Sequence, residues 1–452
     1  MKEKRYLNWF NKIGYGAGDV AGNMVYALLS SFVLIYLTDT VGLSSAIVGT
    51  LMALSKIFDG VTDVFFGNMI DRTRTKMGKA RPWMLWPYIG NVICLIACFA
   101  IPANWGEGAQ YAFFFIAYTL LNGVFFTANN IAYGALTALI TKNENERVQM
   151  GSLRFIFAFA TSLLIQAVTV NAVEFLGGGA EGWKWIAVIY AVIGLIVNTI
   201  SVFSVKELPE SELEHNAEQD APKEKIGYVE TAKLLIKNKY FLLICGIYLL
   251  THISNGFVGI GIFFMTYVMG DANLLGTFAT FTNIPMIIGL LAAPFIIQKM
   301  NGMYKVNLVG YGFATLCRVL VIVGAQMGSV PMMLIFTALA NIGMSPMQGD
   351  LNAVIAACSE HTYLTQGKRV DGSMFSCTSL GVKIGGGLGT AITGWLLDAA
   401  GYINGAAIQP ASALSMLNFM YLWVPMLISI LITILLSRMD VEKANARLMQ
   451  NK

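Results

Sequence analysis

The chain has 452 residues, 56% of them hydrophobic and only 12% charged, and its mean hydropathy is +0.63. Soluble globular proteins carry about 25% charged residues, so this composition excludes an ordinary water-soluble enzyme or binding domain. The small net charge of +4 gives no indication of binding to nucleic acid.

Long apolar stretches recur along the chain, each close to the roughly 20 residues that a helix needs to cross the hydrocarbon core of a membrane. None of them alternates strictly, as the strands of a transmembrane barrel would, so the predicted fold class is an all-α membrane protein. Residues 1–12 are polar and the apolar run after them is too long for a cleavable signal, so this run is predicted to be the first span. Twelve transmembrane helices are predicted in all, at residues 14–37, 45–69, 83–102, 110–140, 150–174, 185–205, 240–268, 274–297, 306–326, 330–354, 373–398 and 413–437.

The longest polar interruption, Lys206–Lys225, separates the first six predicted spans from the last six. It has no apolar periodicity that could form a core, which favours a linker over a small folded domain. The predicted domains are an N-terminal six-helix half at 1–205, a cytoplasmic linker at 206–239 and a C-terminal six-helix half with a tail at 240–452. Basic residues gather in the termini and in the loops after even-numbered spans, so both termini are predicted to be cytoplasmic in a bacterial inner membrane.

The first predicted span carries a polar stripe on an otherwise apolar helix. Four residues recur at i, i+4, i+8 and i+11, which places them on one helical face: Tyr15, Asp19, Asn23 and Tyr26. This stripe is predicted to line a polar cavity. Beside it, Gly14, Gly18 and Gly22 form a ridge of small residues that is typical of close contact between membrane helices.

The second span places three ionisable side chains on one helical face, namely Lys56, Asp59 and Asp63. An ionised side chain in hydrocarbon costs about 2.5–3.5 kcal/mol even on a lenient scale, so a functional reason is expected. Two carboxylates one turn apart repel each other. A proton or Na⁺ relieves the repulsion, the latter with help from a hydroxyl such as that of Thr62, so a cation site is predicted. The alternative is a buried ion pair of Lys56 with Asp59, which leaves Asp63 unexplained.

Polar residues also interrupt the later spans. The fourth contains Thr127 and Asn130, the fifth begins near Arg154, and the eleventh holds Lys383 well inside its ends. Such groups suit a hydroxylated ligand, because a sugar needs donors and acceptors around its hydroxyls and an aromatic face for its ring. Arg318, deep in the ninth span, has no partner that the sequence identifies.

Enzyme chemistry is not indicated. The three histidines are far apart, the six cysteines are scattered, and no nucleophile stands with a base in a recognisable motif. We therefore expect neither an enzymatic activity nor a tightly bound cofactor.

Several motifs in a fixed order resemble one known transporter family. They are Gly-Tyr-Gly-Ala-Gly-Asp-Val-Ala-Gly-Asn at 14–23, Phe-Asp-Gly-Val-Thr-Asp at 58–63, the basic segment 71–83, Asn-Ile-Ala-Tyr-Gly-Ala-Leu at 130–136, Arg154-Phe155, the segment 367–372, and Lys383. Together they resemble the glycoside-pentoside-hexuronide:cation symporters of the major facilitator superfamily over essentially the whole chain. The resemblance implies a fold of two six-helix halves and a secondary transporter that works as a monomer.

The resemblance also implies roles for the polar residues. The coupling cation, Na⁺ or H⁺, is expected to be bound by Asp59, Thr62, Asp63 and Thr127. The sugar site is expected to be formed by Asp19, Asn23, Tyr26, Asn130, Arg154 and Lys383, the last of them beside the cation.

Melibiose permeases, in the same family, hold the sugar chiefly with two acids, a Trp and an Arg. The corresponding positions of the acids here are Asn23 and Asn130, that of the Trp is Gly134, and Arg154 is retained. The motifs therefore look more like the glucuronide and xyloside branches of the family. With two carboxylates fewer and both Arg154 and Lys383 kept, the cavity is expected to be more positive. This favours a carboxylate-bearing sugar such as a β-glucuronide, while neutral xylosides stay open.

The predicted function is cation:sugar symport of a glycoside by alternating access, with a small-molecule sugar, a coupling cation and membrane lipids as partners. The alternative on the same fold is a drug or lipid exporter, which the 23 Met and 27 Phe residues keep open.

Overall fold

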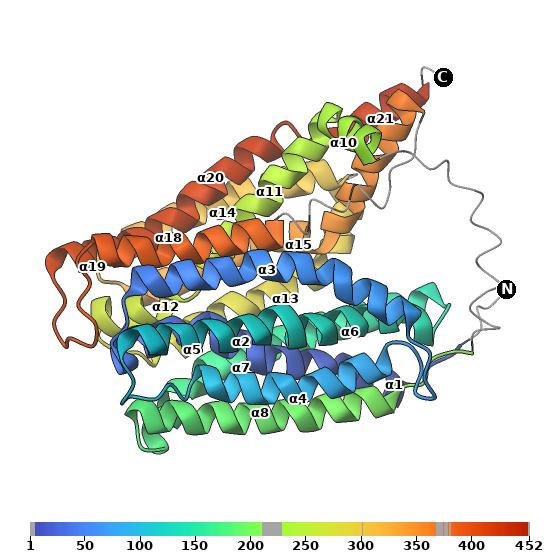
Figure 1. The fold of residues 1–452 in the computed structure, drawn as a ribbon. Helices are drawn as coiled ribbons and strands as arrows, with labels where there is room; N and C mark the ends of the chain where they lie inside the picture. Colours follow the sequence, from blue (N-terminus) through green and yellow to red (C-terminus); the bar gives the residue numbers. More distant parts are fainter. Residues whose placement is uncertain are drawn as a thin grey trace. The chain divides into compact units, whose positions relative to one another are not determined.

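The computed structural model describes residues 5–209, 228–300, 302–367, 374, 378 and 381–450, and every regular element in these ranges is a helix (Figure 1). By length and composition, nine of the described helices can cross a membrane, or ten when the bent pair Lys239–Gly256 and Ile260–Val268 is taken as one span. These ten coincide with spans predicted from the sequence. The other two predicted spans, 83–102 and 373–398, hold α4 (Arg81–Cys98) and α18 (Gly386–Ala399), which are shorter or less apolar.

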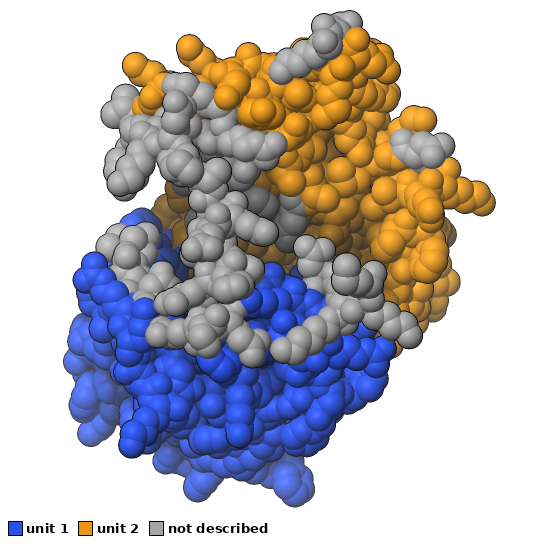
Figure 2. Space-filling view, turned by 90° about the vertical axis from the view of Figure 1, so that its right-hand side faces the viewer, with its two compact units in different colours: residues 1–223, 401–409 blue, residues 224–400, 410–452 orange. Residues whose placement is uncertain are grey.

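The chain divides into two compact units, which Figure 2 shows in different colours. The first unit consists of residues 1–223 and 401–409, and the second of 224–400 and 410–452. Helix α10 (Tyr228–Lys237) lies within the segment predicted as a linker, of which residues 210–227 fall outside the described ranges.

The first unit is a bundle in which several spans contain more than one helical segment. Its helices are α1 (Trp9–Gly16), α2 (Gly18–Ile35), η1 (Tyr36–Val41), α3 (Ser45–Arg72), α4, α5 (Glu107–Leu120), η2 (Leu121–Phe126), α6 (Thr127–Ile140), α7 (Glu144–Phe175) and α8 (Gly179–Ser204). Helices α4 and α8 run side by side (Figure 1). Segment η2 is a wide π-helical turn that joins α5 to α6, and such turns are frequent at functional sites.

The glycine ridge of α1 and α2 packs closely against Tyr133 of α6 and against α8. A Cβ atom at Gly14 would overlap the side chain of Ser204, and one at Gly18 would lie 2.7 Å from the ring of Tyr133. At Gly22, by contrast, nothing lies within 4 Å of that position. The glycine ridge predicted for helix contact therefore serves contact at two positions and leaves open space at the third.

The start of α4 is held by a carboxylate from the end of the N-terminal bundle. Both oxygens of Glu207 accept hydrogen bonds from the amides of Lys79, Ala80 and Arg81, over 2.7–3.0 Å. These amides have no partner within the helix, and a negative charge is favourable at a helix N-terminus. Glu207 thereby connects the loop before α4 to the segment that follows α8.

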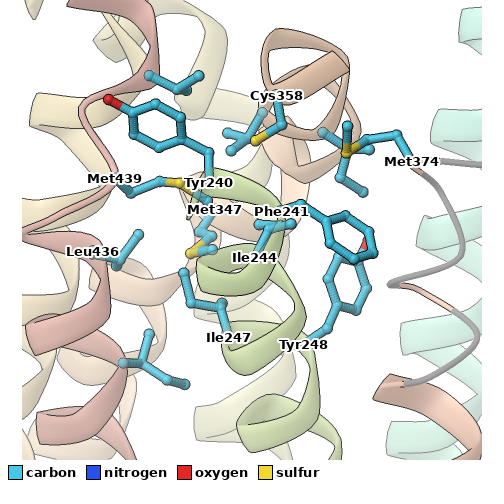
Figure 3. Close-up of a cluster of buried hydrophobic side chains, with 14 of the residues drawn as sticks. Tyr240, Phe241, Ile244, Ile247, Tyr248, Met347, Cys358, Met374, Leu436 and Met439 are labelled. Carbon is cyan, nitrogen blue, oxygen red and sulfur yellow. The ribbon is translucent and has the colours of Figure 1, made fainter. Parts of the chain in front are cut away.

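The second unit is built around helix α11 (Lys239–Gly256). Its other helices are α10, α12 (Ile260–Phe263), η4 (Phe264–Val268), α13 (Leu274–Met300), α14 (Met303–Gln326), α15 (Val330–Gln366), η5 (Gly381–Gly385), α18, α19 (Ala411–Asn418), η6 (Phe419–Trp423), α20 (Val424–Leu436) and α21 (Val441–Gln450). Buried apolar side chains cluster about α11, with Leu436 and Met439 on one side of it and its own Phe241 and Tyr248 projecting to the other (Figure 3). Flexible methionines help to fill this irregular core.

Candidate functional site

The first unit contains a recess of about 100 Å³ formed by α2, η2 and α6. It is lined by Gly18, Asp19, Gly22, Asn23, Tyr26, Phe126, Asn129, Asn130 and Tyr133. Four residues predicted to bind sugar, Asp19, Asn23, Tyr26 and Asn130, therefore surround one cavity.

Asp19 organises the polar side of this cavity. Its Oδ2 accepts a hydrogen bond from Arg154 Nε at 2.6 Å and lies 3.0 Å from the hydroxyl of Tyr133. The guanidinium of Arg154 also lies over the ring of Tyr133, 4.2 Å from its centroid. The ion pair and the cation–π contact connect α2, α6 and α7. Asp19 balances the charge of Arg154, so the pair adds no net charge to the cavity. The cavity is therefore less positive than a count of Arg154 as an unpaired cation would predict.

Several lining groups are available to a ligand. The side chain of Asn130 and the hydroxyl of Tyr26 make no hydrogen bond among the described residues, and Tyr26 is 46% exposed. Asn23 donates its amide to the Asp19 carbonyl at 2.9 Å, which leaves its side-chain oxygen as an acceptor. Asn129, by contrast, donates to the carbonyl of Met84 at 2.6 Å and thus ties α6 to α4. Donors, acceptors and an aromatic ring are the groups that a sugar requires.

A second polar contact lies between α3 and the start of α6. Asp59 and Thr127 are both buried, and the Thr127 hydroxyl donates to Oδ1 of Asp59. The same hydroxyl lies 2.7 Å from the carbonyl of Asn122. Hard cations prefer carboxylate, hydroxyl and carbonyl oxygens, and a buried carboxylate can also hold a proton. Two of the four predicted cation ligands are therefore in contact.

A glycine in the wide turn η2 permits this contact. A Cβ atom at Gly123 would lie 2.8 Å from the ring of Phe58 and 3.7 Å from Cα of Asp59. Helix α3 can approach η2 this closely because residue 123 has no side chain. The wide turn ends at Phe126, so its extra residue changes the direction in which Thr127 points.

The other two predicted cation ligands follow Asp59 on α3. The Thr62 hydroxyl donates to the backbone carbonyl of Asp59 at 3.0 Å, and Asp63 is partly exposed one turn further along. On the preceding turn, Lys56 Nζ lies 5.9 Å from the ring centroid of Tyr26. Through this contact the helix that carries the two carboxylates meets a residue of the cavity wall. The described residues contain no group of three or more His, Cys, Asp or Glu side chains placed to hold a metal ion.

Lys383 belongs to the second unit, in the wide turn η5 that precedes α18. It is therefore on a different unit from the other predicted ligands. Of the motif at 367–372, only Gly367 lies among the described residues, where it ends α15 in a left-handed conformation with φ of 70°.

The polar pattern of the sequence does not predict three residues of the site, Tyr133, Phe126 and Gly123. Tyr133 follows Asn130 by three residues and Phe126 precedes it by four, so helical spacing alone indicates that both share its face. Gly123 leaves no comparable signal, since its role depends on how closely another helix approaches it.

A family model described as MFS/sugar transport protein matches residues 14–443 of the chain. The chain belongs to this family. The match confirms the resemblance that the ordered motifs indicated. As a member of the MFS/sugar transport family, the protein is a multi-pass membrane transporter and not an enzyme.

Relatives within the family include transporters of sugars. The isoprimeverose transporter of Lactiplantibacillus pentosus is 27% identical over 427 residues, which cover 93% of this chain and 86% of the relative. The glucuronide carrier protein homolog of Escherichia coli strain K12 is 26% identical over 413 residues, with 89% and 86% covered. The inner membrane symporter YicJ of the same strain is 26% identical over 441 residues, with 94% and 90% covered.

Solved structures support the fold. A bacterial homolog of the human lysosomal transporter Spinster, in an inward-facing and unoccupied conformation, is 14% identical, with a TM-score of 0.63. The match covers 98% of this chain and 96% of that one. At this identity the likeness concerns the fold alone, which is the all-α fold of the major facilitator superfamily.

Proposed function

We propose that the protein is a cation:sugar symporter that carries a glycoside across a bacterial inner membrane by alternating access. The observation that carries the proposal is that one unit holds both a polar cavity around Asp19 and a buried carboxylate–hydroxyl contact between Asp59 and Thr127. An isoprimeverose transporter, a glucuronide carrier homolog and an inner membrane symporter among the relatives support the substrate class, the coupling and the membrane.

In this proposal the polar cavity binds the sugar. Asp19, Asn23 and Asn130 hold the hydroxyls, Tyr26 and Phe126 supply aromatic surface, and Arg154 orients Asp19. Lys383 is a further proposed sugar ligand. The cation, Na⁺ or H⁺, binds at Asp59, Thr62, Asp63 and Thr127. The Lys56–Tyr26 contact gives a short route by which cation occupancy can alter the cavity wall.

Coupling arises because each ligand stabilises the arrangement that the other prefers. Inward movement of one positive charge releases about 2.3 kcal/mol per 100 mV of membrane potential, which is enough to concentrate a neutral sugar. The moving parts are two halves, residues 1–205 and 240–452, which the cytoplasmic linker 206–239 joins. In this proposal the protein works as a monomer surrounded by lipid, with both termini in the cytoplasm.

Transport by proteoliposomes tests the proposal. Purified protein should accumulate a labelled glycoside when an inward gradient of Na⁺ or H⁺ is imposed, and should only equilibrate it without a gradient. Asp63→Asn should abolish accumulation but retain exchange of internal for external glycoside. The matched control is Asp271→Asn, which removes an exposed carboxylate outside the helices and should leave accumulation intact. Absence of glycoside uptake by the wild type, together with extrusion of a hydrophobic dye, would establish the exporter instead.

A further inference from the structure

A short segment between α18 and α19 belongs to the first compact unit. Residues 401–409 pack within that unit, whereas the chain immediately before and after them belongs to the second. The segment is therefore joined covalently, at both ends, to helices of a different unit. By sequence it lies in the C-terminal half, so at this point the division by packing differs from the division by sequence.

Three hydrogen bonds fasten the segment to the end of the first span. The hydroxyl of Tyr402 donates to Oδ1 of Asp39, in η1, at 2.7 Å. The side-chain amide of Asn404 lies 3.1 Å and 2.9 Å from the carbonyl oxygens of Gly42 and Leu43. Both carbonyls stand just beyond η1, where the helix offers them no donor. The segment thus supplies donors that the end of the span lacks.

The surface that receives the segment is itself fixed. The hydroxyl of Thr38, a fully buried residue, donates to the same Oδ1 of Asp39 at 2.9 Å and so orients the carboxylate. Gly405 approaches the backbone here, because a Cβ atom at this position would lie 2.9 Å from the carbonyl oxygen of Asp39. Its φ of 65° is also one that glycine adopts at little cost. The contact is therefore close as well as hydrogen-bonded.

Hydrogen bonds within the segment give it a shape of its own. Gln409 is buried, and its side-chain oxygen accepts from the amide of Ile403 at 3.0 Å. Its side-chain nitrogen donates to the carbonyls of Ile403 and Ala406, at 2.7 Å and 3.2 Å. A loop that its own side chains hold together is a compact body and not a slack tether. It therefore docks on η1, or leaves it, as one piece.

We propose that residues 401–409 form a latch that docks on η1 in one state of the transport cycle and undocks from it in another. The inference rests on the proposed function, because alternating access requires the two halves to move against each other. The latch is joined to one half and bonded to the other, so this movement pulls on the bonds to Asp39 and to the carbonyls after η1. A compact loop cannot absorb the movement by stretching, so these bonds must break.

The predicted topology gives the latch a side of the membrane. The first predicted span ends at residue 37 and the eleventh at residue 398, so Asp39 and the latch both follow odd-numbered spans. With the termini in the cytoplasm, these loops lie on the periplasmic side. Docking of the latch is therefore a periplasmic event, on the face from which a symporter takes up its sugar.

Cross-linking tests whether the latch must undock. Asp39→Cys combined with Tyr402→Cys places a thiol at each end of the contact, and a bifunctional thiol reagent with a reducible spacer joins them. The probe is labelled methyl β-D-xyloside or methyl β-D-glucuronide, whichever wild-type proteoliposomes accumulate. Exchange of the probe should fall at least about tenfold after cross-linking and recover after reduction, because a required conformational step is blocked. Each single variant, treated with the same reagent, is the matched control and should keep its exchange.

Weakening the contact tests the latch without a cross-link. Tyr402→Phe and Asn404→Ala each remove hydrogen bonds that favour docking by a factor of about two to ten. Leu43→Cys provides a reporter thiol at a position that is 1% exposed while the latch is docked. Its labelling by a membrane-impermeant maleimide should accelerate by about the same factor in either variant. Ile408→Ala alters a side chain of the latch that is 87% exposed, and as the matched control it should leave the rate unchanged.

Undiminished exchange by the cross-linked protein would overturn the inference, and so would a labelling rate that neither Tyr402→Phe nor Asn404→Ala changes. If the protein with two new thiols does not fold, the labelling rates decide; if the reporter variant does not fold, the cross-link decides. A wild type that exchanges the probe equally well with and without the cross-link refutes this inference alone. A wild type that takes up no glycoside refutes the proposed function.

Discussion

Arg154 on α7 donates a hydrogen bond to Asp19 on α2 over 2.6 Å, although the two residues are far apart in the chain. Asp19 lines the cavity, whereas Arg154 does not. The arginine therefore fixes the orientation of an acceptor, and the ion pair leaves the local charge balanced. We therefore expect these two residues, which the sequence analysis assigned together to the sugar site, to have different tasks.

Breaking this pair should destabilise the bundle. Asp19→Asn leaves the charge of Arg154 unpartnered, and Arg154→Gln leaves a free carboxylate. Each change is expected to lower the free energy of unfolding by about 1–3 kcal/mol, toward the lower end because both side chains are partly exposed. The double variant should lose less than the sum of the two single losses, since it removes both charges. Unfolding of the purified variants measures these values, and strictly additive losses would contradict a direct interaction.

Tyr133→Phe removes the hydroxyl of this residue and keeps its ring, so the variant distinguishes the roles of the two groups. The ring still supports the guanidinium of Arg154, but the group 3.0 Å from Asp19 is lost. We expect glycoside affinity to fall roughly three- to tenfold with little change in stability. Tyr190→Phe is the matched control, because it removes a buried hydroxyl that bonds Thr169 at 2.9 Å outside the cavity. Equal losses of affinity in the two variants would show that Tyr133 has no specific role.

Gly22→Val should block the cavity without disturbing the fold. The site of its Cβ atom is open, and the residue lines the recess. We expect loss of glycoside binding with unfolding close to that of the wild type. Gly312→Val fills a similarly open position on α14 of the second unit, does not line the recess, and should keep binding. Gly18→Val, which places atoms against Tyr133, should instead cost about 1–3 kcal/mol of stability. Normal binding by Gly22→Val would place the sugar elsewhere.

Glu146 gives a pH-dependent contribution to stability. Burial disfavours its charged form, but the hydrogen bond from Thr141, those from the amides of Leu7 and Tyr6, and the charge of Lys12 outweigh burial and lower the pKa of this carboxyl below its ordinary value of 4.5. A lowered pKa in the folded state stabilises the protein above the unfolded value, so the contribution is present at neutral pH. It is lost as the pH falls through the lower folded-state value.

The test compares the wild type with Glu146→Gln across this range. At neutral pH the variant should be less stable by about 1–3 kcal/mol, and the difference should shrink as the pH falls below 4.5. Thermal unfolding of both proteins at a series of pH values measures the difference. A gap that stays constant down to strongly acidic pH would mean that the charge of Glu146 is not the cause.

The sequence predicts features that belong to a single helix better than features that depend on two. Apolar length was sufficient to place ten of the twelve predicted spans. The i, i+4 spacing of Asp19 and Asn23 was sufficient to assign them to one face of α2. The same reasoning did not pair Arg154 with Asp19, because nothing local in the chain relates α7 to α2. It also treated Gly22 as a contact residue, since a glycine that packs and a glycine that lines open space look identical in sequence.

Wide helical turns are a second feature that sequence periodicity does not predict. Periodicity assumes a regular helix, yet η2 inserts an extra residue just before Thr127 and so changes which neighbours that residue meets. Gly123 is essential to the contact with Asp59, but its importance arises only from the closeness of α3. The role of such a residue can be recognised only from the three-dimensional structure.

The central claim is that a cation held at Asp59 and Thr127 controls how tightly a glycoside is bound. Calorimetric titration of the purified protein with one glycoside, at increasing Na⁺ and separately at decreasing pH, tests it most directly. We predict that one of the two cations tightens binding by about 5- to 150-fold in the wild type, as coupling of this kind typically does, and that Asp59→Asn binds with an affinity independent of both. An affinity insensitive to both cations in the wild type, or cation dependence that persists unchanged in Asp59→Asn, would contradict the account.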